Sequence, residues 1–191
     1  MRIASFVVTV LILWGHVSDE LRAEVRSADA HGFSIEIERK TKASVDEIDR
    51  AIVKEIHQWW DAAHSYSGEA ENLSIDLKRR CFDERLPDGG FVTHMQIAHY
   101  QPGARIRFMG GLGPLQEMGV VGALTISWEP DGDVTKIKLL YNVTGHLADG
   151  QLQELAPVVD AVLAGQLDRL ANHVATRPKR GTGTERTSSD G

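Results

Sequence analysis

The sequence predicts an α+β domain in which a curved antiparallel sheet wraps around a long C-terminal helix. One observation is a series of short segments between Leu73 and Thr144, in which apolar and polar residues alternate and turn sequences intervene. The other is a long segment from Leu152 to Val174 with an apolar stripe at helical spacing. Such a stripe must be buried, and the sheet is the surface that can cover it.

A strand and a helix precede the series of strands. Phe33, Ile35 and Ile37 alternate with polar residues, which is the period of a half-buried strand. Ser44 followed by Glu47 predicts a capping box at the start of a helix. Apolar residues then recur at helical spacing, namely Val45, Ile48, Ile52, Val53, Ile56 and Trp59. This helix leads into the segment IHQWWDAAHSYSG, residues 56–68, which holds two of the chain's four tryptophans.

The strands that follow are separated by turn-forming residues such as those of Pro87-Asp88-Gly89-Gly90. Their predicted ranges are 73–77, 79–86, 91–101, 105–109, 119–129 and 134–144. The stripe of the last helix comprises Leu152, Leu155, Val159, Val162, Leu163, Leu170 and Val174. Because Pro157 suits a first turn, the regular helix is expected to begin near Ala156.

The chain has 191 residues, of which 42% are hydrophobic, so we expect one domain with a sizeable core and two tails. Residues 1–30 are assigned to a signal peptide and a short linker, and residues 31–176 to the domain. Residues 177–191 hold no apolar side chain to bury and are predicted to be a disordered tail.

The signal peptide is predicted from the nearly uninterrupted apolar run Ile3–Trp14 behind Arg2. This run is short for a membrane span. Ala23 and Ala30 each end a sequence that signal peptidase could cleave. We therefore expect an exported protein, periplasmic or secreted, without stable membrane insertion after cleavage. A buried N-terminal element or an uncleaved membrane anchor is the alternative.

Composition excludes several classes of partner and site. The formal net charge of −6 argues against nucleic acid as a partner, since phosphate binding needs a basic face. The single cysteine, Cys81, excludes an internal disulfide and a zinc site of several cysteines. His57, Asp61 and His64 could share a helix face, but no convergent set of residues has metal-ligand spacing. We expect neither a metal nor a cofactor.

The order strand, helix, meander and long helix resembles the helix-grip fold of the SRPBCC superfamily, which includes START, pollen-allergen-like and polyketide cyclase-like proteins. Within it, the chain is similar to small exported bacterial members of the activator of heat-shock-protein-90 ATPase homologue-like family. The resemblance spans about residues 33–176 and rests on Trp59-Trp60, residues 64–68, Asn72-Leu73-Ser74, Cys81-Phe82, residues 84–87, Gly89-Gly90, His94, residues 110–115 and residues 163–167.

The chain also departs from that family pattern. Arg79 and Arg80 stand where small residues are expected, and Asp83 stands where a second cysteine often occurs, which excludes a paired-cysteine site. The family name is not to be taken literally, because an exported protein would not meet a cytosolic chaperone. The glycine-rich residues 111–114 also lack the lysine of a Walker-type loop.

The fold that the resemblance implies holds apolar ligands in a cavity between the sheet and the C-terminal helix. The residues expected to line that cavity are Trp59, Trp60, Tyr66, His94, Phe108, Leu112, Leu115, Met118, Tyr141, Val159 and Leu163. Adjacent helical residues point about 100° apart, so one of the two tryptophans could instead belong to the core. Residues 110–120 are interpreted as a lid over the cavity or as a crossover whose leucines complete the core.

Three polar residues are candidates for acid–base chemistry: His64, Tyr66 and His94. Together they could enolise a carbonyl compound, as the cyclase-like relatives do. The alternative for His94 is a hydrogen-bonded structural histidine, because it lies within an alternating strand and shares a face with Val92, Gln96 and Tyr100.

Three functions follow from these observations. The first is an exported, non-enzymatic domain that binds a small hydrophobic molecule in the cavity. The second is a cyclase- or dehydrase-like enzyme with His64, Tyr66 and His94 at the cavity mouth. The third is a protein-binding module like the chaperone ATPase activators, which would show an exposed apolar patch and no cavity.

Overall fold

The computed structural model describes residues 23–148 and 150–177. Its centre is one eight-stranded antiparallel sheet with the strand order β1-β2-β8-β7-β6-β5-β4-β3. The strands are β1 (Ala23–Asp29), β2 (Gly32–Thr41), β3 (Leu73–Asp76), β4 (Cys81–Arg85), β5 (Phe91–Gln101), β6 (Arg105–Gly110), β7 (Val121–Asp131) and β8 (Val134–Thr144). The predicted α+β helix-grip fold is confirmed.

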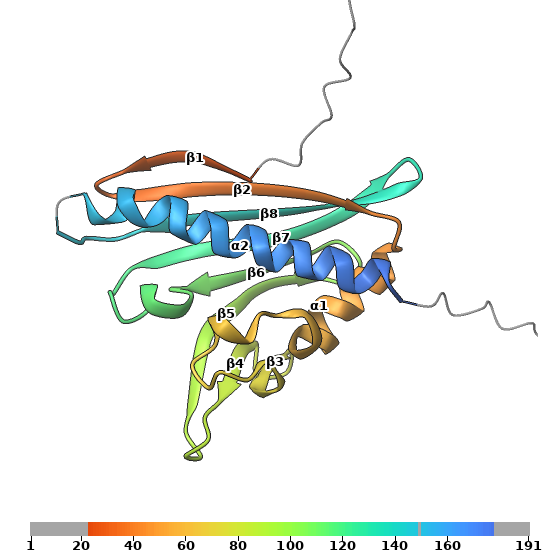
Figure 1. Ribbon diagram of the computed structural model, residues 1–191, viewed down its shortest axis with the longest axis horizontal. Helices are drawn as coiled ribbons and strands as arrows, with labels where there is room; N and C mark the ends of the chain where they lie inside the picture. Colours follow the sequence, from red (N-terminus) through yellow and green to blue (C-terminus); the bar gives the residue numbers. More distant parts are fainter. Residues whose placement is uncertain (1–22, 149, 178–191) are drawn as a thin grey trace, which may run out of the picture.

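Two α-helices pack on this sheet, and three 3-10 turns lie between the elements. The α-helices are α1 (Val45–Trp59) and α2 (Gln151–Ala175), and the 3-10 turns are η1 (Ala62–His64), η2 (Ala70–Asn72) and η3 (Gly113–Leu115). Figure 1 shows α2 lying along the sheet, with α1 beside its C-terminal half and β3 beyond α1. The most extensive contacts of α2 are with β2, β1 and α1.

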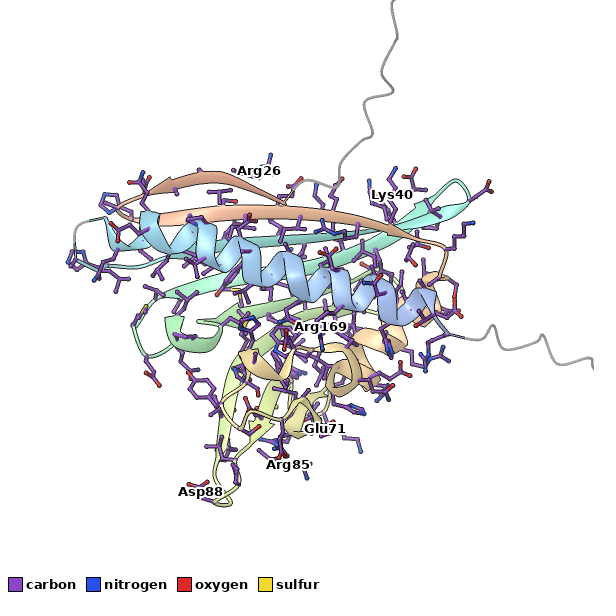
Figure 2. The ribbon with its side chains drawn as sticks, viewed as in Figure 1. Arg26, Lys40, Glu71, Arg85, Asp88 and Arg169 are labelled. Carbon is purple, nitrogen blue, oxygen red and sulfur yellow. The ribbon has the colours of Figure 1, made fainter. Side chains whose placement is uncertain are left out.

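Alternation along the central strands forms the core under α2. On β2, Ile35 and Ile37 are fully buried, and their partners on β8, Tyr141 and Leu139, are buried as well. The predicted shared face of the last strand is therefore correct. Charged residues lie at the periphery: Figure 2 shows Arg26, Lys40, Arg85 and Asp88 around the outside of the molecule, whereas Arg169 lies between α2 and α1.

The start of α1 forms as its sequence predicts. The Ser44 hydroxyl accepts from the Glu47 N–H at 3.3 Å, and the Glu47 carboxylate accepts from the Ser44 N–H at 2.8 Å, which is a complete capping box. The helix ends at Trp59, so the segment from Trp60 onward leaves it as a loop.

The long helix begins earlier than predicted. It starts at Gln151, after Gly150 with a φ of 82°, so Pro157 lies inside the helix and not in its first turn. Proline removes one hydrogen bond to the carbonyl four residues before it, here that of Gln153, which is exposed and can bond water instead. Leu152 and Ala156 are fully buried and hold these first turns against the protein.

The boundaries of the domain also differ from the prediction. Strand β1 pairs with β2 through partners such as Val25 and Ile35, so the sheet begins at Ala23 and not after residue 30. At the other end, Arg177 donates to both carboxylate oxygens of the buried Glu55 on α1 and belongs to the domain. The predicted signal sequence, residues 3–14, and residues 178–191 of the predicted tail lie outside the described residues.

Removal of β1 is expected to destabilise the domain. A chain that begins at His31 lacks β1, whereas one that begins at Glu24 keeps nearly all of it. Without β1 the outer edge of β2 loses its hydrogen-bonding partner, and Val25 and Ala28 no longer pack against the core. We expect the free energy of unfolding of the shorter chain, measured by urea denaturation, to be lower by about 2 kcal/mol or more. Equal stability of the two chains would contradict a structural role for β1.

Candidate functional site

A pocket of about 410 Å³ lies beside the N-terminal half of α2. Four segments form its wall: the loop after α1, strand β5, the β6–β7 connection and α2. The lining residues are Trp60, Ala63, His64, Ser65, Tyr66, His94, Leu112, Gly113, Pro114, Leu115, Met118, Leu155, Val158, Val159, Val162 and Leu163. Most of these side chains are apolar, and the pocket is therefore lined as sites for hydrophobic molecules usually are.

Helix α2 contributes the widest apolar wall. Its stripe is wider than the sheet can cover, so Leu163 is buried while Val159 and Val162 are partly exposed and line the pocket. Val158, one position outside the predicted stripe, is 58% exposed at the same pocket. The half of the stripe that the core leaves uncovered is thus available to a ligand.

Hydrogen bonds fix the loop after α1 as the opposite wall. The Trp60 indole donates to the carbonyl of His64 at 3.0 Å, and this bond folds the loop back toward its first residue. The Asp61 side chain caps the 3-10 turn by accepting from the Ala63 N–H at 3.0 Å. The Asp61 N–H donates to the buried Gln166 side chain of α2 at 2.9 Å, so the loop is joined directly to the helix that it faces.

The β6–β7 connection contributes to the core and to the lining of the pocket. Leu115 is buried and completes the core, while Leu112 and Met118 line the pocket. The bend requires Gly111, where a Cβ atom would lie 2.6 Å from the carbonyl oxygen of Val120. The Leu112 N–H also donates to the Tyr141 hydroxyl at 3.2 Å, so the connection is anchored at its first residues.

A β-bulge places His94 inside the protein. Thr93 pairs with Asp83 and Met95 with Phe82, which leaves His94 as the extra residue between them. Because of the bulge, His94 and Met95 are both buried although they are adjacent in a strand. The prediction that His94 shares a face with Gln96 is therefore wrong, since Gln96 is exposed.

His94 is held by a buried carboxylate. Its Nε2 lies 2.9 Å from Oε2 of Glu84, and the two side chains are 4% and 0% exposed. Glu84 also accepts hydrogen bonds from the backbone N–H groups of Tyr66 and Ser67. The His94 ring packs between Phe82 and Tyr66, with ring centroids 4.8 and 5.8 Å away. One carboxylate thus joins strands β4 and β5 to the loop after α1.

The environment sets the charge of both partners. Burial alone would raise the pKa of Glu84, but hydrogen bonds from Ser67, Tyr66 and His94 outweigh it and hold that pKa below its usual 4.5. Burial lowers the pKa of His94 below its usual 6.5, against the opposing effect of Glu84. At neutral pH the pair is therefore a carboxylate and a neutral imidazole.

The ionised Glu84 determines the tautomer of His94. A carboxylate only accepts hydrogen bonds, so Nε2 must carry the proton and donate it. In the neutral ring Nδ1 then holds a lone pair. Nδ1 is buried and has no hydrogen-bond partner within the described structure. A buried acceptor without a partner is unfavourable by about 1–3 kcal/mol.

The pocket brings together most of the predicted site residues. Those that line it are Trp60, His64, Tyr66, His94, Leu112, Leu115, Met118, Val159 and Leu163. Trp59, Phe108 and Tyr141 do not, because all three are buried in the core. The Trp59 indole donates instead to the Ala51 carbonyl at 2.9 Å. His64 is exposed, and Tyr66 is 43% exposed at the pocket.

Glu84 is the main residue that the sequence analysis missed. A glutamate in a strand is ordinarily solvated, and the donors that allow its burial come from residues 17 and 18 positions earlier in the chain. A faint signal was available, because the adjacent apolar residues Cys81 and Phe82 place one apolar side chain on each face of the strand. All four residues from Cys81 to Glu84 are in fact buried.

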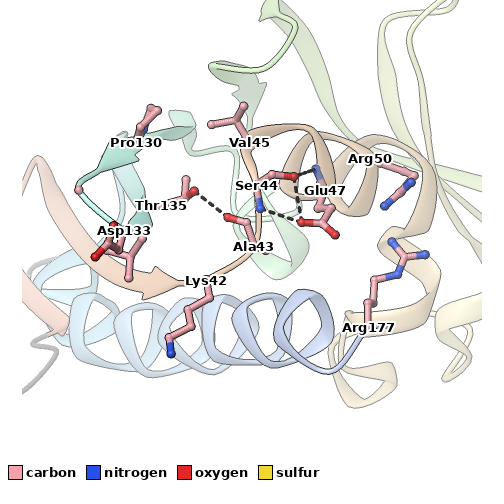
Figure 3. A pocket seen from close by; sticks show the side chains of 12 residues that line it. Lys42, Ala43, Ser44, Val45, Glu47, Arg50, Pro130, Asp133, Thr135 and Arg177 are labelled. Carbon is pink, nitrogen blue, oxygen red and sulfur yellow. Dashed lines mark hydrogen bonds between the residues drawn. The ribbon is translucent and has the colours of Figure 1, made fainter. Parts of the chain in front are cut away.

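A second, wider pocket of about 820 Å³ lies at the start of α1 (Figure 3). Lys42, Arg50 and Arg177 line it together with Glu47 and Asp133, and its floor includes the hydrogen bond from Thr135 to the Ala43 carbonyl at 2.7 Å. Arg177 is engaged by Glu55. Charged side chains of both signs line this pocket, whereas none of the described residues that line the pocket beside α2 is Asp, Glu, Lys or Arg, so the pocket beside α2 is the better candidate for an apolar ligand.

Metal ligands and membrane spans were also sought in the described part of the chain. Within residues 23–148 and 150–177, no group of three or more His, Cys, Asp or Glu side chains is arranged to hold a metal ion. Neither described helix is long and apolar enough to cross a membrane.

Comparison with known proteins finds similarity in structure and none in sequence. No protein-family model matches the sequence, and no curated protein matches it. A conserved protein of unknown function from Enterococcus faecalis, EF2215, superposes with a TM-score of 0.55 and 16% identity over 81% of this chain and 78% of its own. DynU16, from the dynemicin biosynthetic locus, superposes with a TM-score of 0.53 and 17% identity, over 75% of this chain and 47% of its own. The Aha1 dimer of Colwellia psychrerythraea superposes with a TM-score of 0.52 and 14% identity, over 75% of this chain and 96% of its own.

These neighbours establish the class of fold. The chain has a helix-grip α+β fold that it shares with these neighbours, and this fold is consistent with the SRPBCC type that the sequence resembles. At such low identities the neighbours carry information on the fold alone. The narrower resemblance, to the homologue-like family of the chaperone ATPase activator, stays a prediction.

Replacing Glu84 by glutamine is expected to destabilise the protein. An amide has one acceptor oxygen, and its NH₂ group would face one of the donors that now bind the carboxylate. We expect Glu84→Gln to lower the free energy of unfolding by about 2–4 kcal/mol in urea denaturation. Glu71→Gln, at an exposed glutamate, is the control and should stay within about 0.5 kcal/mol of the parent. If the two variants were equally stable, Glu84 would not have the role assigned to it.

Stability should depend on pH through His94. Its pKa is below 6.5 in the folded protein, so the unfolded chain takes up this proton first as the pH falls. The contribution of His94 is thus complete above pH 6.5 and declines as the pH falls from 6.5 toward the folded pKa. His94→Gln keeps a donor for Glu84 but does not titrate. The stability of the parent should fall more steeply than that of the variant below pH 6.5, and parallel curves would refute the assignment.

Proposed function

We propose that this chain is an exported binding protein that holds a small hydrophobic molecule in the pocket beside α2. The observation that carries the proposal is a hollow of about 410 Å³ walled by apolar side chains from four separate segments. Pockets for small organic ligands typically measure about 300–1,000 Å³ and combine an apolar lining with a few polar groups. One polar group of this pocket is His94, which Glu84 holds at the wall.

The exposed apolar side chains at the pocket support binding by burial of apolar surface. Tyr66, Met118 and Val158 are 43%, 41% and 58% exposed, and all three line the pocket. A ligand that covers them removes apolar area from water, at about 25 cal/mol for each Å². The anchored walls limit the ordering that binding requires.

Export is proposed from the apolar run Ile3–Trp14 behind Arg2. Of the two cleavage positions that the sequence offers, the one after Ala23 leaves the sheet nearly complete, because β1 spans Ala23–Asp29. Cleavage after Ala30 would remove that strand. The fold therefore favours the earlier position.

An enzyme of the cyclase or dehydrase type is the second candidate, and the His94–Glu84 pair favours it. A neutral imidazole whose Nε2–H is held by a carboxylate can take a proton at Nδ1, which is what a general base must do. Tyr66, 5.8 Å from His94 between ring centroids, could act as the partner acid. Burial raises the pKa of Tyr66, with Glu117 and Glu84 adding to the effect, so its hydroxyl keeps its proton at neutral pH.

Filling the pocket is expected to abolish binding. N-phenyl-1-naphthylamine is a suitable probe, because its fluorescence rises in an apolar site. Val159→Trp places a large ring in the pocket and should weaken probe binding about tenfold or more. The control, Ala161→Trp, lies on the exposed side of the same helix and should bind the probe as the parent does.

Two results would contradict the proposal: no probe binding by the parent, or unchanged binding by Val159→Trp. Native mass spectrometry of the protein purified from its own host then separates the two candidate functions. A co-purified molecule that is unchanged by incubation with fresh protein supports binding, and one whose mass changes supports the enzyme.

A further inference from the structure

One residue that lines the pocket has a buried polar atom without a hydrogen-bond partner in the described part of the chain. Four buried side-chain atoms lack a hydrogen-bond partner in the described structure: Nε of Arg50, Nδ1 of His94, Nε1 of Trp128 and Oδ1 of Asp160. Of these residues, His94 alone lines the pocket beside α2. Its side chain is 4% exposed and Nδ1 itself is buried, so bulk water does not replace the missing partner, and a ligand reaches Nδ1 only when neighbouring side chains shift.

The missing partner must be a hydrogen-bond donor. Glu84 binds Nε2 at 2.9 Å and, as a carboxylate, can only accept from it. That leaves Nδ1 with a lone pair, and a lone pair is satisfied by an O–H or N–H group. The rings of Phe82 and Tyr66 pack against the His94 ring, with centroids 4.8 and 5.8 Å away, and help to keep it in place. The acceptor is thus fixed before any ligand arrives.

The charges around the pocket exclude an anionic partner. None of the described residues that line it is lysine or arginine. The nearest fixed charge to His94 is the buried carboxylate of Glu84, and the Glu117 carboxylate acts on Tyr66 at the same pocket. A ligand carboxylate or phosphate placed here would be desolvated next to like charges without a cation to compensate it.

Building on the proposed function, we propose that the ligand is a neutral apolar alcohol or phenol whose hydroxyl donates a hydrogen bond to Nδ1 of His94. The apolar body of this ligand lies against Val159, Val162 and Leu112, and its hydroxyl is directed toward β5. By the same geometry, fatty acids and other apolar carboxylates are poor ligands.

Three probes of one ring system test this inference by calorimetry near neutral pH: 2-naphthol, 2-methoxynaphthalene and 2-naphthoate. The methyl ether keeps the apolar body and removes the donor. We expect 2-naphthol to bind about 2- to 12-fold more tightly than the ether, the range that corresponds to one net hydrogen bond. The carboxylate should bind most weakly of the three.

Two measurements assign the preference to His94. In ¹⁵N NMR of the parent protein, the Nδ1 resonance of His94 should shift on addition of 2-naphthol and stay unchanged with the ether. In His94→Leu, no acceptor remains at the Nδ1 position, so naphthol and ether should bind equally. His99→Leu, exposed on the same strand, is the control and should keep the preference. The NMR result stands on the parent alone if His94→Leu does not fold.

The outcomes separate this inference from the function on which it rests. Equal affinity of the parent for 2-naphthol and the ether, or an unmoved Nδ1 resonance, would overturn the inference and leave the proposed binding function intact. Tightest binding of 2-naphthoate would also overturn it. If none of the three probes bound, the proposed function would fail and the inference with it.

Discussion

Glu84 bears a negative charge at a position without solvent exposure, and the donors around it must supply what water would otherwise provide. They come from two places: the backbone of Tyr66 and Ser67, in the loop after α1, and the ring of His94 on the neighbouring strand. The loop, the bulge in β5 and the end of β4 are therefore positioned by one carboxylate. The wall of the pocket that carries polar groups exists because these three elements meet there.

The apolar side of the pocket has a different origin. Helix α2 presents more apolar surface than the sheet can cover, because Leu163 and Leu167 reach the core while Val159 and Val162 lie farther round the helix. The loop after α1 could have closed over these valines. Instead, the bond from Asp61 to Gln166 holds the loop at the helix near the core end of the pocket, and the hollow stays open beyond it. The pocket is thus a consequence of an incompletely covered stripe combined with a fixed loop.

Local sequence patterns predicted most helices and strands well, but not strand β1, the bulge at His94 or the burial of Glu84. The capping box at Ser44 and the alternation of the last strand depend on neighbours within a few positions, and both formed as expected. Strand β1 was missed because it lies within a range whose apolar and charged residues read as an export signal. The bulge at His94 was missed because a one-residue insertion leaves no mark in a period-2 pattern. The burial of Glu84 depends on donors from a distant loop, which no local rule contains. Much of the apolar lining was predictable, and so were His64, Tyr66 and His94 as pocket residues, whereas the buried carboxylate that holds His94 was not.

The unpartnered nitrogen of His94 links stability to ligand binding. A buried acceptor without a donor lowers the stability of the empty protein by about 1–3 kcal/mol. In the proposed complex, a ligand that supplies the donor gains about 0.5–1.5 kcal/mol, the net value of one hydrogen bond, in addition to what its apolar surface contributes. A ligand without the donor leaves the nitrogen unsatisfied. Under this proposal the same atom favours one class of molecule and disfavours another of equal size and shape.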